Sequence, residues 1–221
     1  MNSGLLWLAV VWIIYFLLHS LFASLAVKRC IAAQWPNAVR SYRLAYNIAA
    51  VILLIPPLGL MVVIDGTPLW QWRGVWAWFA NGIAIVAVAG FFWSLRFYDS
   101  GTFLGLRQLS ESETAIDNRE HLTISPLHRV VRHPWYFLAL LVIWTRDMDS
   151  AFLVTGVVIT AYFVIGSRLE ESKLIALYGD AYREYIKRVP GLLPLPWKIL
   201  SLAAARALEN QATKIPPATA R

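Results

Sequence analysis

The N-terminal part of the chain contains the feature that most constrains the fold, an unbroken run from Asn2 to Val27 without Asp, Glu, Lys or Arg. A bilayer hydrocarbon core is about 30 Å thick, and about 20 apolar residues cross it as an α-helix. Further apolar runs follow, and 58% of the 221 residues are hydrophobic whereas 15% are charged. Because soluble domains average about 25% charged residues, the sequence predicts an all-α integral membrane protein.

The N-terminal half is expected to hold three membrane spans, at residues 4–27, 44–64 and 75–95. Pro56 and Pro57 lie inside the second span, where they predict a kink. A tight turn is expected at residues 65–68, because it contains Asp, Gly and Pro. The tryptophans at 70, 72, 76 and 78 indicate an interfacial aromatic belt.

The C-terminal half contains two shorter apolar segments, at residues 134–145 and 151–167. The polar turn at 146–150 joins them, so they predict a tight antiparallel helical hairpin, with Pro134 in the first turn of its helix. After Arg168, apolar side chains recur at steps of three and four residues, which predicts an amphipathic helix ended by Val189-Pro190-Gly191. We expect one more surface helix at 197–208 and a disordered tail at 211–221.

The distribution of basic residues predicts the orientation in the membrane. Of the 20 Lys and Arg, 18 fall in the first and third connecting loops and the C-terminal tail, and the first loop alone contains Lys28, Arg29, Arg40 and Arg43. The positive-inside rule then predicts five spans of the bacterial inner-membrane type, with the N-terminus outside and the C-terminus in the cytoplasm.

This topology divides the chain into four parts. Residues 1–97 are expected to form N-terminal transmembrane helices, and 98–132 a cytoplasmic connecting segment. Residues 133–196 are expected to form a catalytic hairpin and helix, and 197–221 a surface helix and flexible tail. In the connecting segment, residues 103–109 are apolar enough to lie along the membrane surface, and four acidic residues are expected in water: Glu111, Glu113, Asp117 and Glu120.

Composition also argues against several other classes. The net charge of +7 is explained by cytoplasmic loops better than by nucleic-acid binding. A single cysteine, Cys30, excludes an internal disulfide, and no Cys/His spacing is typical of a metal site. The absence of charged residues from the middle of the spans argues against a transporter.

Two charged clusters are the candidates for chemistry, Arg132-His133-Pro134-Trp135-Tyr136 and Arg168-Leu169-Glu170-Glu171. We expect both on the cytoplasmic side, facing each other across one pocket. Two adjacent carboxylates need partners, so Arg132 or His133 is expected to pair with Glu170 or Glu171. Arg168 lies three residues from Glu171, at a spacing that also allows a pair on the helix.

Simpler interpretations exist for most of these residues. Basic residues such as Arg132 and His133 can be snorkelling anchors at a membrane surface. His19 is most simply a hydrogen-bonded helix contact. Tyr178, Tyr182 and Tyr185 most simply form the apolar face of the last helix, although one ring could stack on an adenine.

The order and spacing of these motifs resemble the isoprenylcysteine carboxyl methyltransferase family. The resemblance rests on Arg132-His133-Pro134-x-Tyr136, the hairpin, Glu170-Glu171-x-x-Leu174, Tyr178-Gly179-x-x-Tyr182-x-x-Tyr185 and Val189-Pro190. In the N-terminal half, His19-Ser20-x-x-Ala23-Ser24, Tyr42-Arg43-x-x-Tyr46-Asn47 and the run from Phe103 to Gln108 are most similar to the methanethiol S-methyltransferase and NnrU-like branches. One departure is Ser125-Pro126-Leu127-His128, where the family usually has Ser-Gly-x-Tyr.

The resemblance implies S-adenosyl-L-methionine as the methyl donor, bound at the cytoplasmic end of the hairpin. Carboxylates suit the positive ammonium and sulfonium groups of the donor, and Arg or His suits its carboxylate. Arg168, Glu171 and His133 are the expected catalytic residues. The expected donor-binding residues are His128, Arg132, His133, Pro134, Tyr136, Glu170, Glu171 and Tyr182.

The methyl acceptor is expected to be a small or lipophilic thiol that reaches the site from the membrane lipid. Arg107, Gln108 and His19 are the candidate acceptor-binding residues, and nearby cations would favour the reactive thiolate. Two alternatives remain open: a non-catalytic NnrU-like or nurim-like membrane protein that retains the fold, and methylation of a prenylcysteine carboxylate or a lipid amine. The sequence does not define an oligomeric state.

Overall fold

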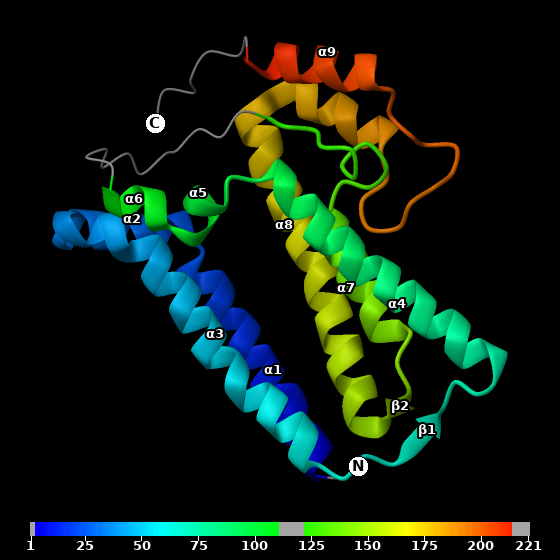
Figure 1. The fold of residues 1–221 in the computed structure, drawn as a ribbon. Helices are drawn as coiled ribbons and strands as arrows, with labels where there is room; N and C mark the ends of the chain where they lie inside the picture. Colours follow the sequence, from blue (N-terminus) through cyan, green and yellow to red (C-terminus); the bar gives the residue numbers. More distant parts are fainter. Residues whose placement is uncertain (1–2, 111–121, 214–221) are drawn as a thin grey trace. The chain divides into compact units, whose positions relative to one another are not determined.

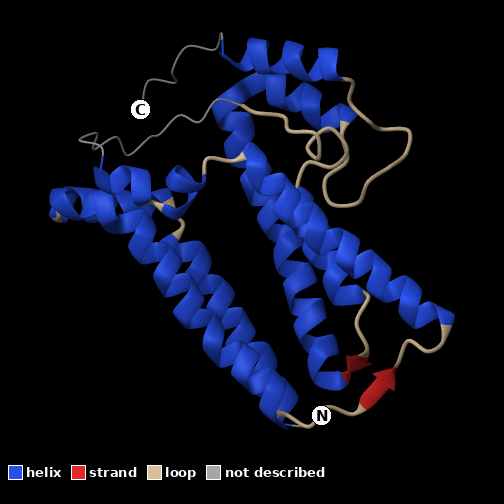
Figure 2. Ribbon diagram, viewed as in Figure 1, coloured by secondary structure: helices blue, strands red, loops and turns tan. Residues whose placement is uncertain are grey.

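The computed structural model describes residues 3–110 and 122–213, and nearly all of its regular structure is helical (Figure 2). The described residues form two compact units. Unit 1 contains the residues up to Trp78, 95–110 and Arg146–Ile159. Unit 2 contains Phe79–Ser94, 122–145 and 160–213. The expected acidic patch lies outside the described residues.

Two long helices, α1 (Ser3–Phe22) and α3 (Val39–Val63), pack side by side in unit 1 (Figure 1). Leu8 and Trp12 of α1 are buried there against Ala151, from the first turn of α8 (Ser150–Arg188). The indole Nε1 of Trp12 donates to Thr155 Oγ1 over 3.0 Å. This bond satisfies the one polar atom of the tryptophan, as burial requires.

The first helix is shorter than the expected span of 4–27, because a second helix begins before Val27. Helix α1 ends at Phe22, and α2 runs over Leu25–Gln34. Ser24 caps α2, since its Oγ accepts the backbone N–H of Val27 at 3.3 Å. Lys28 and Arg29 are therefore helical, which corrects their expected place in a loop.

The second span begins earlier than expected. After the short helix η1 (Pro36–Ala38), α3 starts at Val39, so that Arg40 and Arg43 are also helical rather than part of a loop. The helix continues through Pro56 and Pro57 to Val63. The tight turn expected at residues 65–68 is not found: residues 65–67 form a short irregular link, and Pro68 already begins β1.

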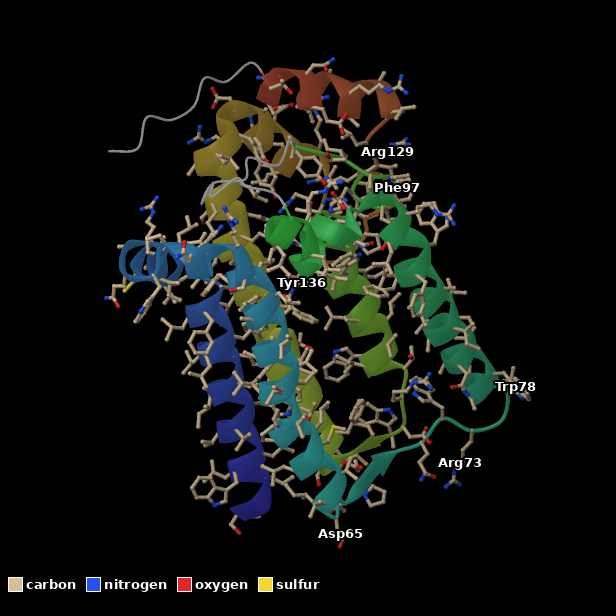
Figure 3. The ribbon with its side chains drawn as sticks, turned by 60° about the vertical axis from the view of Figure 1, so that its left-hand side comes forward. Asp65, Arg73, Trp78, Phe97, Arg129 and Tyr136 are labelled. Carbon is tan, nitrogen blue, oxygen red and sulfur yellow. The ribbon has the colours of Figure 1, made fainter. Side chains whose placement is uncertain are left out.

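A short antiparallel strand pair, not expected from the sequence, joins distant parts of unit 1. Strand β1 (Pro68–Trp70) pairs with β2 (Met148–Asp149), with Pro68 opposite Asp149. Thr67 N donates to Ser150 Oγ over 3.0 Å beside the pair. Asp65 and Arg73 lie at this end of the unit (Figure 3).

The third span is confirmed as α4 (Val75–Ser94). Its first turn carries Trp78, which is 82% exposed, consistent with the expected aromatic belt (Figure 3). After η2 (Leu95–Phe97), the expected surface stretch forms two short helices, α5 (Ser100–Leu104) and α6 (Leu106–Ser110). Gly105 separates them with φ +86°, and a Cβ there would lie 2.7 Å from the backbone N of Leu44, so only glycine fits.

Unit 2 contains the first arm of the expected hairpin, the part of the second arm from residue 160 onward and the last helix, whereas residues 146–159 belong to unit 1. Helix α7 (Pro134–Trp144) has Pro134 in its first turn, as expected. The second arm does not end at Ser167: α8 continues to Arg188, so the expected second arm and amphipathic helix are one element with a break at Gly179. The last helix, α9 (Leu202–Thr213), begins five residues later than the expected 197–208.

The membrane interpretation is supported by four long apolar helices among the described residues: Ser3–Phe22, Pro36–Val63, Val75–Phe97 and Ser150–Arg188. Helix α7 is apolar but has 11 residues, about 16 Å at 1.5 Å per residue. The chain is thus an all-α membrane protein, and within residues 3–110 and 122–213 four helices reach a spanning length, while α7, the remaining one of the five expected spans, is shorter.

The core of unit 2 lies where α9 covers the second part of α8. Tyr178, Tyr182 and Tyr185 are buried there against Leu208 of α9. Gly179 breaks the helix between Tyr178 and Tyr182, so burial in one core, and not helical spacing alone, brings the three rings together. This burial confirms the simpler interpretation that the tyrosines form the apolar face of the expected amphipathic helix.

Candidate functional site

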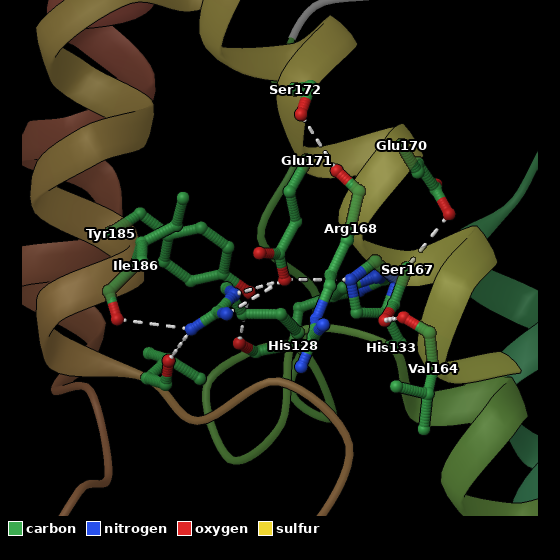
Figure 4. A network of polar contacts seen from close by, with 12 residues as sticks. His128, His133, Val164, Ser167, Arg168, Glu170, Glu171, Ser172, Tyr185 and Ile186 are labelled. Atoms are coloured by element: carbon green, nitrogen blue, oxygen red, sulfur yellow. Dashed lines mark hydrogen bonds and ion pairs between the residues drawn. The ribbon is translucent and has the colours of Figure 1, made fainter. Parts of the chain in front are cut away.

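The two charged clusters meet directly in unit 2, at one carboxylate oxygen (Figure 4). Glu171 Oε1 lies 2.8 Å from Arg132 Nε and 2.7 Å from Arg132 Nη2. His133 Nε2 lies 2.9 Å from the same oxygen. This confirms the expected pairing of the two clusters, and the expected pocket between them stays a prediction.

The loop after α8 holds the Arg132–His133 pair through its backbone. The backbone N–H of Arg132 donates to Pro190 O at 2.8 Å, and that of His133 donates to Gly191 O at 3.1 Å. Arg132 Nη1 also donates to the carbonyls of Ile186 and Val189. The C-terminal stop of the helix therefore both ends α8 and positions the cluster.

Gly191 is needed for this close approach. A Cβ built on it would lie 3.3 Å from Arg132 Nη2 and 3.8 Å from Glu171 Oε1. The first distance is tighter than ordinary contacts, and the guanidinium is held by several bonds. A side chain here would therefore push against the ion pair.

Glu170 is the more accessible of the two carboxylates. The side chain of Glu170 is 50% exposed, whereas that of Glu171 is 15% exposed. Glu170 Oε2 lies 3.4 Å from His133 Nδ1. Arg168 is exposed and forms no ion pair within the described residues. The Arg168–Glu171 pair that the helical spacing allowed is not made, because Glu171 turns to Arg132 and His133.

His133 lies between two carboxylates, and this favours its charged form. Burial opposes protonation, but the hydrogen bonds and negative charges of Glu170 and Glu171 together outweigh it and raise the pKa of His133 above its ordinary value. A protonated imidazole donates from both nitrogens, one toward each carboxylate. Arg132 and Glu171 therefore form an ion pair, and His133 lies between the two carboxylates in a setting that favours its imidazolium form.

His128 is held in the opposite state. Burial above all, together with the nearby charge of His133 and against the opposing charge of Glu170, lowers the pKa of His128 to about 4. Its Nδ1 lies 2.8 Å from Ser125 Oγ, and its backbone oxygen accepts the hydroxyl of Tyr185. His128 is therefore neutral at physiological pH.

The unusual run Ser125-Pro126-Leu127-His128 forms an ordered turn without the glycine of the family pattern. The backbone N–H of Arg129 donates to Ser125 O at 3.1 Å, and that of Val131 donates to Leu127 O at 3.0 Å. These bonds fix the backbone that leads into Arg132.

Three rings form a stack beside the charged cluster. The rings of His133 and Tyr136 are 5.5 Å apart and inclined by 9°, and those of Tyr136 and Phe163 are 4.4 Å apart and inclined by 4°. Pro134 sets the start of α7, so that Tyr136 projects from its first turn toward α8. A protonated His133 gains from the face of Tyr136 as a cation does over a π system.

Tyr182 is placed near the cluster but inside the core. Its side chain is 2% exposed, and its ring packs edge-on against Tyr185 at 5.5 Å. The structure therefore gives this ring a supporting position beneath the site and no exposed face for stacking.

The three candidate acceptor residues lie in unit 1. His19 Nε2 lies 2.8 Å from the hydroxyl of Tyr46, so His19 is a hydrogen-bonded helix contact. Arg107 pairs with Asp99 over 2.6 Å, at an exposed position. Gln108 donates to Thr102 O at 3.3 Å, and its Oε1 is buried without a hydrogen-bond partner among the described residues.

Two contacts that support the site were missed by sequence reasoning. Arg129 Nε donates to Leu200 O at 2.7 Å, and Glu209 Oε1 accepts the backbone N–H of Ile124 at 2.6 Å. Both tie the segment before Arg132 to the C-terminal region, across 71 and 85 residues. Residue type and spacing carry no signal for such distant partners.

The chain is similar in sequence to several methanethiol S-methyltransferases. Methanethiol S-methyltransferase 2 of Bradyrhizobium diazoefficiens is 32% identical over 179 residues, covering 80% of this chain and 68% of that protein. Methanethiol S-methyltransferase of Crocosphaera subtropica is 31% identical over 163 residues, covering 64% and 59%. That of Mycobacterium tuberculosis is 30% identical over 149 residues, covering 58% and 57%. No family model and no solved structure matches the chain.

Proposed function

Because the chain belongs to the methanethiol S-methyltransferase family, we propose that it transfers a methyl group from S-adenosyl-L-methionine to a small or lipophilic thiol. The chain spans about two thirds of the first of these relatives and less of the other two. The observation that carries the proposal is the buried network of Arg132, His133 and Glu171, with Glu170 and Arg168 exposed beside it.

The residues at this network fit the donor by their charges. Glu170 offers a half-exposed carboxylate for an ammonium or sulfonium group. Arg168 offers an exposed guanidinium for a carboxylate. Arg132, His133, Pro134 and Tyr136 would shape the site, with Glu171 holding the first two in place. His128 and Tyr182 would support it from the core.

The donor supplies a methyl group already bonded to a positively charged sulfur. The protein is then required mainly to align the two reacting sulfur atoms, since alignment alone can lower a barrier by several kcal/mol. The thiol must lose its proton to attack, and cations lower a thiol pKa. We assign this effect to His133 and Arg168, with Arg107, Gln108 and His19 as acceptor-side candidates.

The proposed orientation places this chemistry in the cytoplasm, where a water-soluble donor is present. The N-terminus would lie outside and the C-terminus inside, as the distribution of basic residues indicates.

Calorimetric titration of the donor into purified protein tests the proposal. We expect wild-type protein to bind, Arg168→Ala to bind at least tenfold more weakly, and Arg183→Ala to bind as wild type. Arg183 is a matched control, because it is an exposed arginine of the same helix that pairs with Asp180. Glu171→Gln is expected to abolish binding by releasing Arg132 and His133, and Arg107→Ala to lower turnover more than donor affinity.

Thermal unfolding of each variant shows whether it is folded. Absence of binding to folded wild-type protein at millimolar donor would refute the proposal. Donor binding without methyl transfer to any thiol, amine or carboxylate would favour the non-catalytic alternative.

A further inference from the structure

Unit 2 contains an apolar pocket that the charged network does not explain. Its volume is about 360 Å³, and it is lined by residues of α7, α8 and the loop after Gly191. Phe137, Leu140, Leu141 and Trp144 contribute from α7. Their spacing of three and four residues places them along one face of the helix, so the pocket follows its length.

The indole of Trp144 and the hydroxyl of Thr145, which line the pocket, already donate hydrogen bonds within the protein. Trp144 Nε1 donates to Thr160 Oγ1 over 3.1 Å, and the hydroxyl of Thr145 donates to Leu141 O at 2.6 Å. A ligand therefore meets a surface that is effectively apolar. Hydrocarbon is the chemistry that such a surface binds.

The pocket adjoins the charged network at one end. Leu192 lines it and directly follows Gly191, which lies against Arg132 and Glu171. Val164 lines it from α8 and follows Phe163, the last ring of the stack on His133. Val164 is seen in the same view as the network (Figure 4). A molecule with a reactive head at the network can therefore extend an apolar tail along α7.

The pocket is much larger than methanethiol requires. A cavity of about 150 Å³ accepts benzene, with its six carbons. A thiol with one carbon would leave most of 360 Å³ unfilled. By the same scale of about 25 Å³ per carbon, the volume matches an alkyl chain of up to roughly fourteen carbons.

We propose that this pocket binds the alkyl chain of the methyl acceptor, so that the protein methylates longer n-alkanethiols in preference to methanethiol. The inference rests on the proposed methyl transfer. In that transfer, the thiol gives its proton to water, and the thiolate sulfur bonds to the donor's methyl carbon. The bond from that carbon to the sulfonium breaks, and its electron pair stays on the departing sulfur as a neutral thioether.

Burial of each methylene should improve kcat/KM by roughly fourfold until the pocket is filled. Longer thiols also concentrate in detergent or lipid, which raises their apparent affinity without any pocket. The decisive comparison is therefore between wild-type protein and a pocket variant in the same detergent. It asks how much the variant changes the dependence of kcat/KM on the length of the thiol's alkyl chain.

The experiment measures kcat/KM for methanethiol, butanethiol and octanethiol at saturating donor. Leu141→Trp places a large ring in the pocket, and Val164→Phe fills it from α8 should the first variant fail to fold. Ile165→Trp is the control, because Ile165 is 58% exposed and its neighbour Val164 lines the pocket. We expect the wild-type preference for octanethiol over methanethiol to fall at least tenfold in the pocket variants and to persist in Ile165→Trp.

If kcat/KM depended on thiol chain length equally in wild-type protein and the pocket variants, the inference would be overturned. The pocket would then be occupied by lipid tails. Methylation of methanethiol without any gain for butanethiol would overturn it too. Methylation of no thiol by wild-type protein would instead overturn the proposed function, so the two failures are distinguishable.

Discussion

Glu171 connects both charged clusters through one carboxylate oxygen. The side chains of Arg132 and Glu171 are 10% and 15% exposed, so water screens their interaction only weakly. Removing one partner of such a pair leaves an uncompensated charge, which typically costs about 3–5 kcal/mol. An exposed pair three residues apart on a helix contributes only about 0.2–0.5 kcal/mol, which explains why Glu171 pairs with Arg132 rather than with Arg168.

His128 predicts a pH dependence of stability. Because its pKa is about 4 in the folded protein and about 6.5 when unfolded, the unfolded state binds its proton first as the pH falls. The stability that neutral His128 contributes is thus present above pH 6.5 and lost between about 6.5 and 4. We expect His128→Asn, whose amide can still bond Ser125, to weaken this slope by up to ~1.4 kcal/mol per pH unit.

Thermal unfolding of both proteins between pH 7.5 and 4.5 measures that difference. His133 acts in the opposite sense: because its pKa is raised in the folded protein, its contribution to stability is fully present below about pH 6.5 and is lost as the pH rises above that value. His133 is present in both proteins, so this contribution is shared in the comparison. Parallel curves for the two proteins would contradict the assignment of a buried, neutral His128.

At the scale of elements, α8 shows why the apolar pattern misplaced a boundary. The charges at Arg168 and Glu171 end the apolar pattern, but a change of side-chain polarity does not stop backbone hydrogen bonding. The break comes at Gly179, with φ +54° and ψ −130°, a conformation that L side chains rarely adopt. Arg168, Glu170 and Glu171 therefore project from the unbroken stretch of α8 before Gly179. A helix fixes their positions more firmly than a loop would.

Substitution of two glycines of α8 tests this account. Gly179→Ala should lower the free energy of unfolding by about 1–3 kcal/mol, because alanine is strained at that φ. Gly166→Ala is the matched control within the same helix. Its Cβ would meet only the Tyr136 hydroxyl at an ordinary 3.9 Å, so we expect a change of about 0.5–1 kcal/mol toward higher stability. Denaturant unfolding in detergent measures both, and equal effects would show that Gly179 does not require its conformation.

At the scale of the whole molecule, the long apolar helices indicate that the protein lies in a membrane. The distribution of basic residues between them predicts the orientation of the chain in that membrane. Cys30 offers a test without any engineered label, because it is the single cysteine of the chain and is exposed on α2 beside Lys28 and Arg29. The proposed orientation places it in the cytoplasm.

A membrane-impermeant maleimide should therefore label Cys30 in inverted inner-membrane vesicles but not in intact spheroplasts. Cys30→Ser provides the blank. Labelling in spheroplasts would reverse the proposed orientation and place the charged network on the outer side.

The sequence by itself determined that the chain belongs in a membrane, that it is helical, where the third span lies, and that Arg132 and His133 pair with the Glu170–Glu171 run. Those features depend on local pattern: apolar length and unpaired charge. Only the tertiary structure decided that Glu171 is the shared partner, that α8 continues past Ser167 to a break at Gly179, that β1 pairs with β2, and that Glu209 and Leu200 hold the loop before Arg132. These depend on contacts between residues far apart in the chain, whose free energy is set by burial in the folded protein and is not encoded by spacing alone.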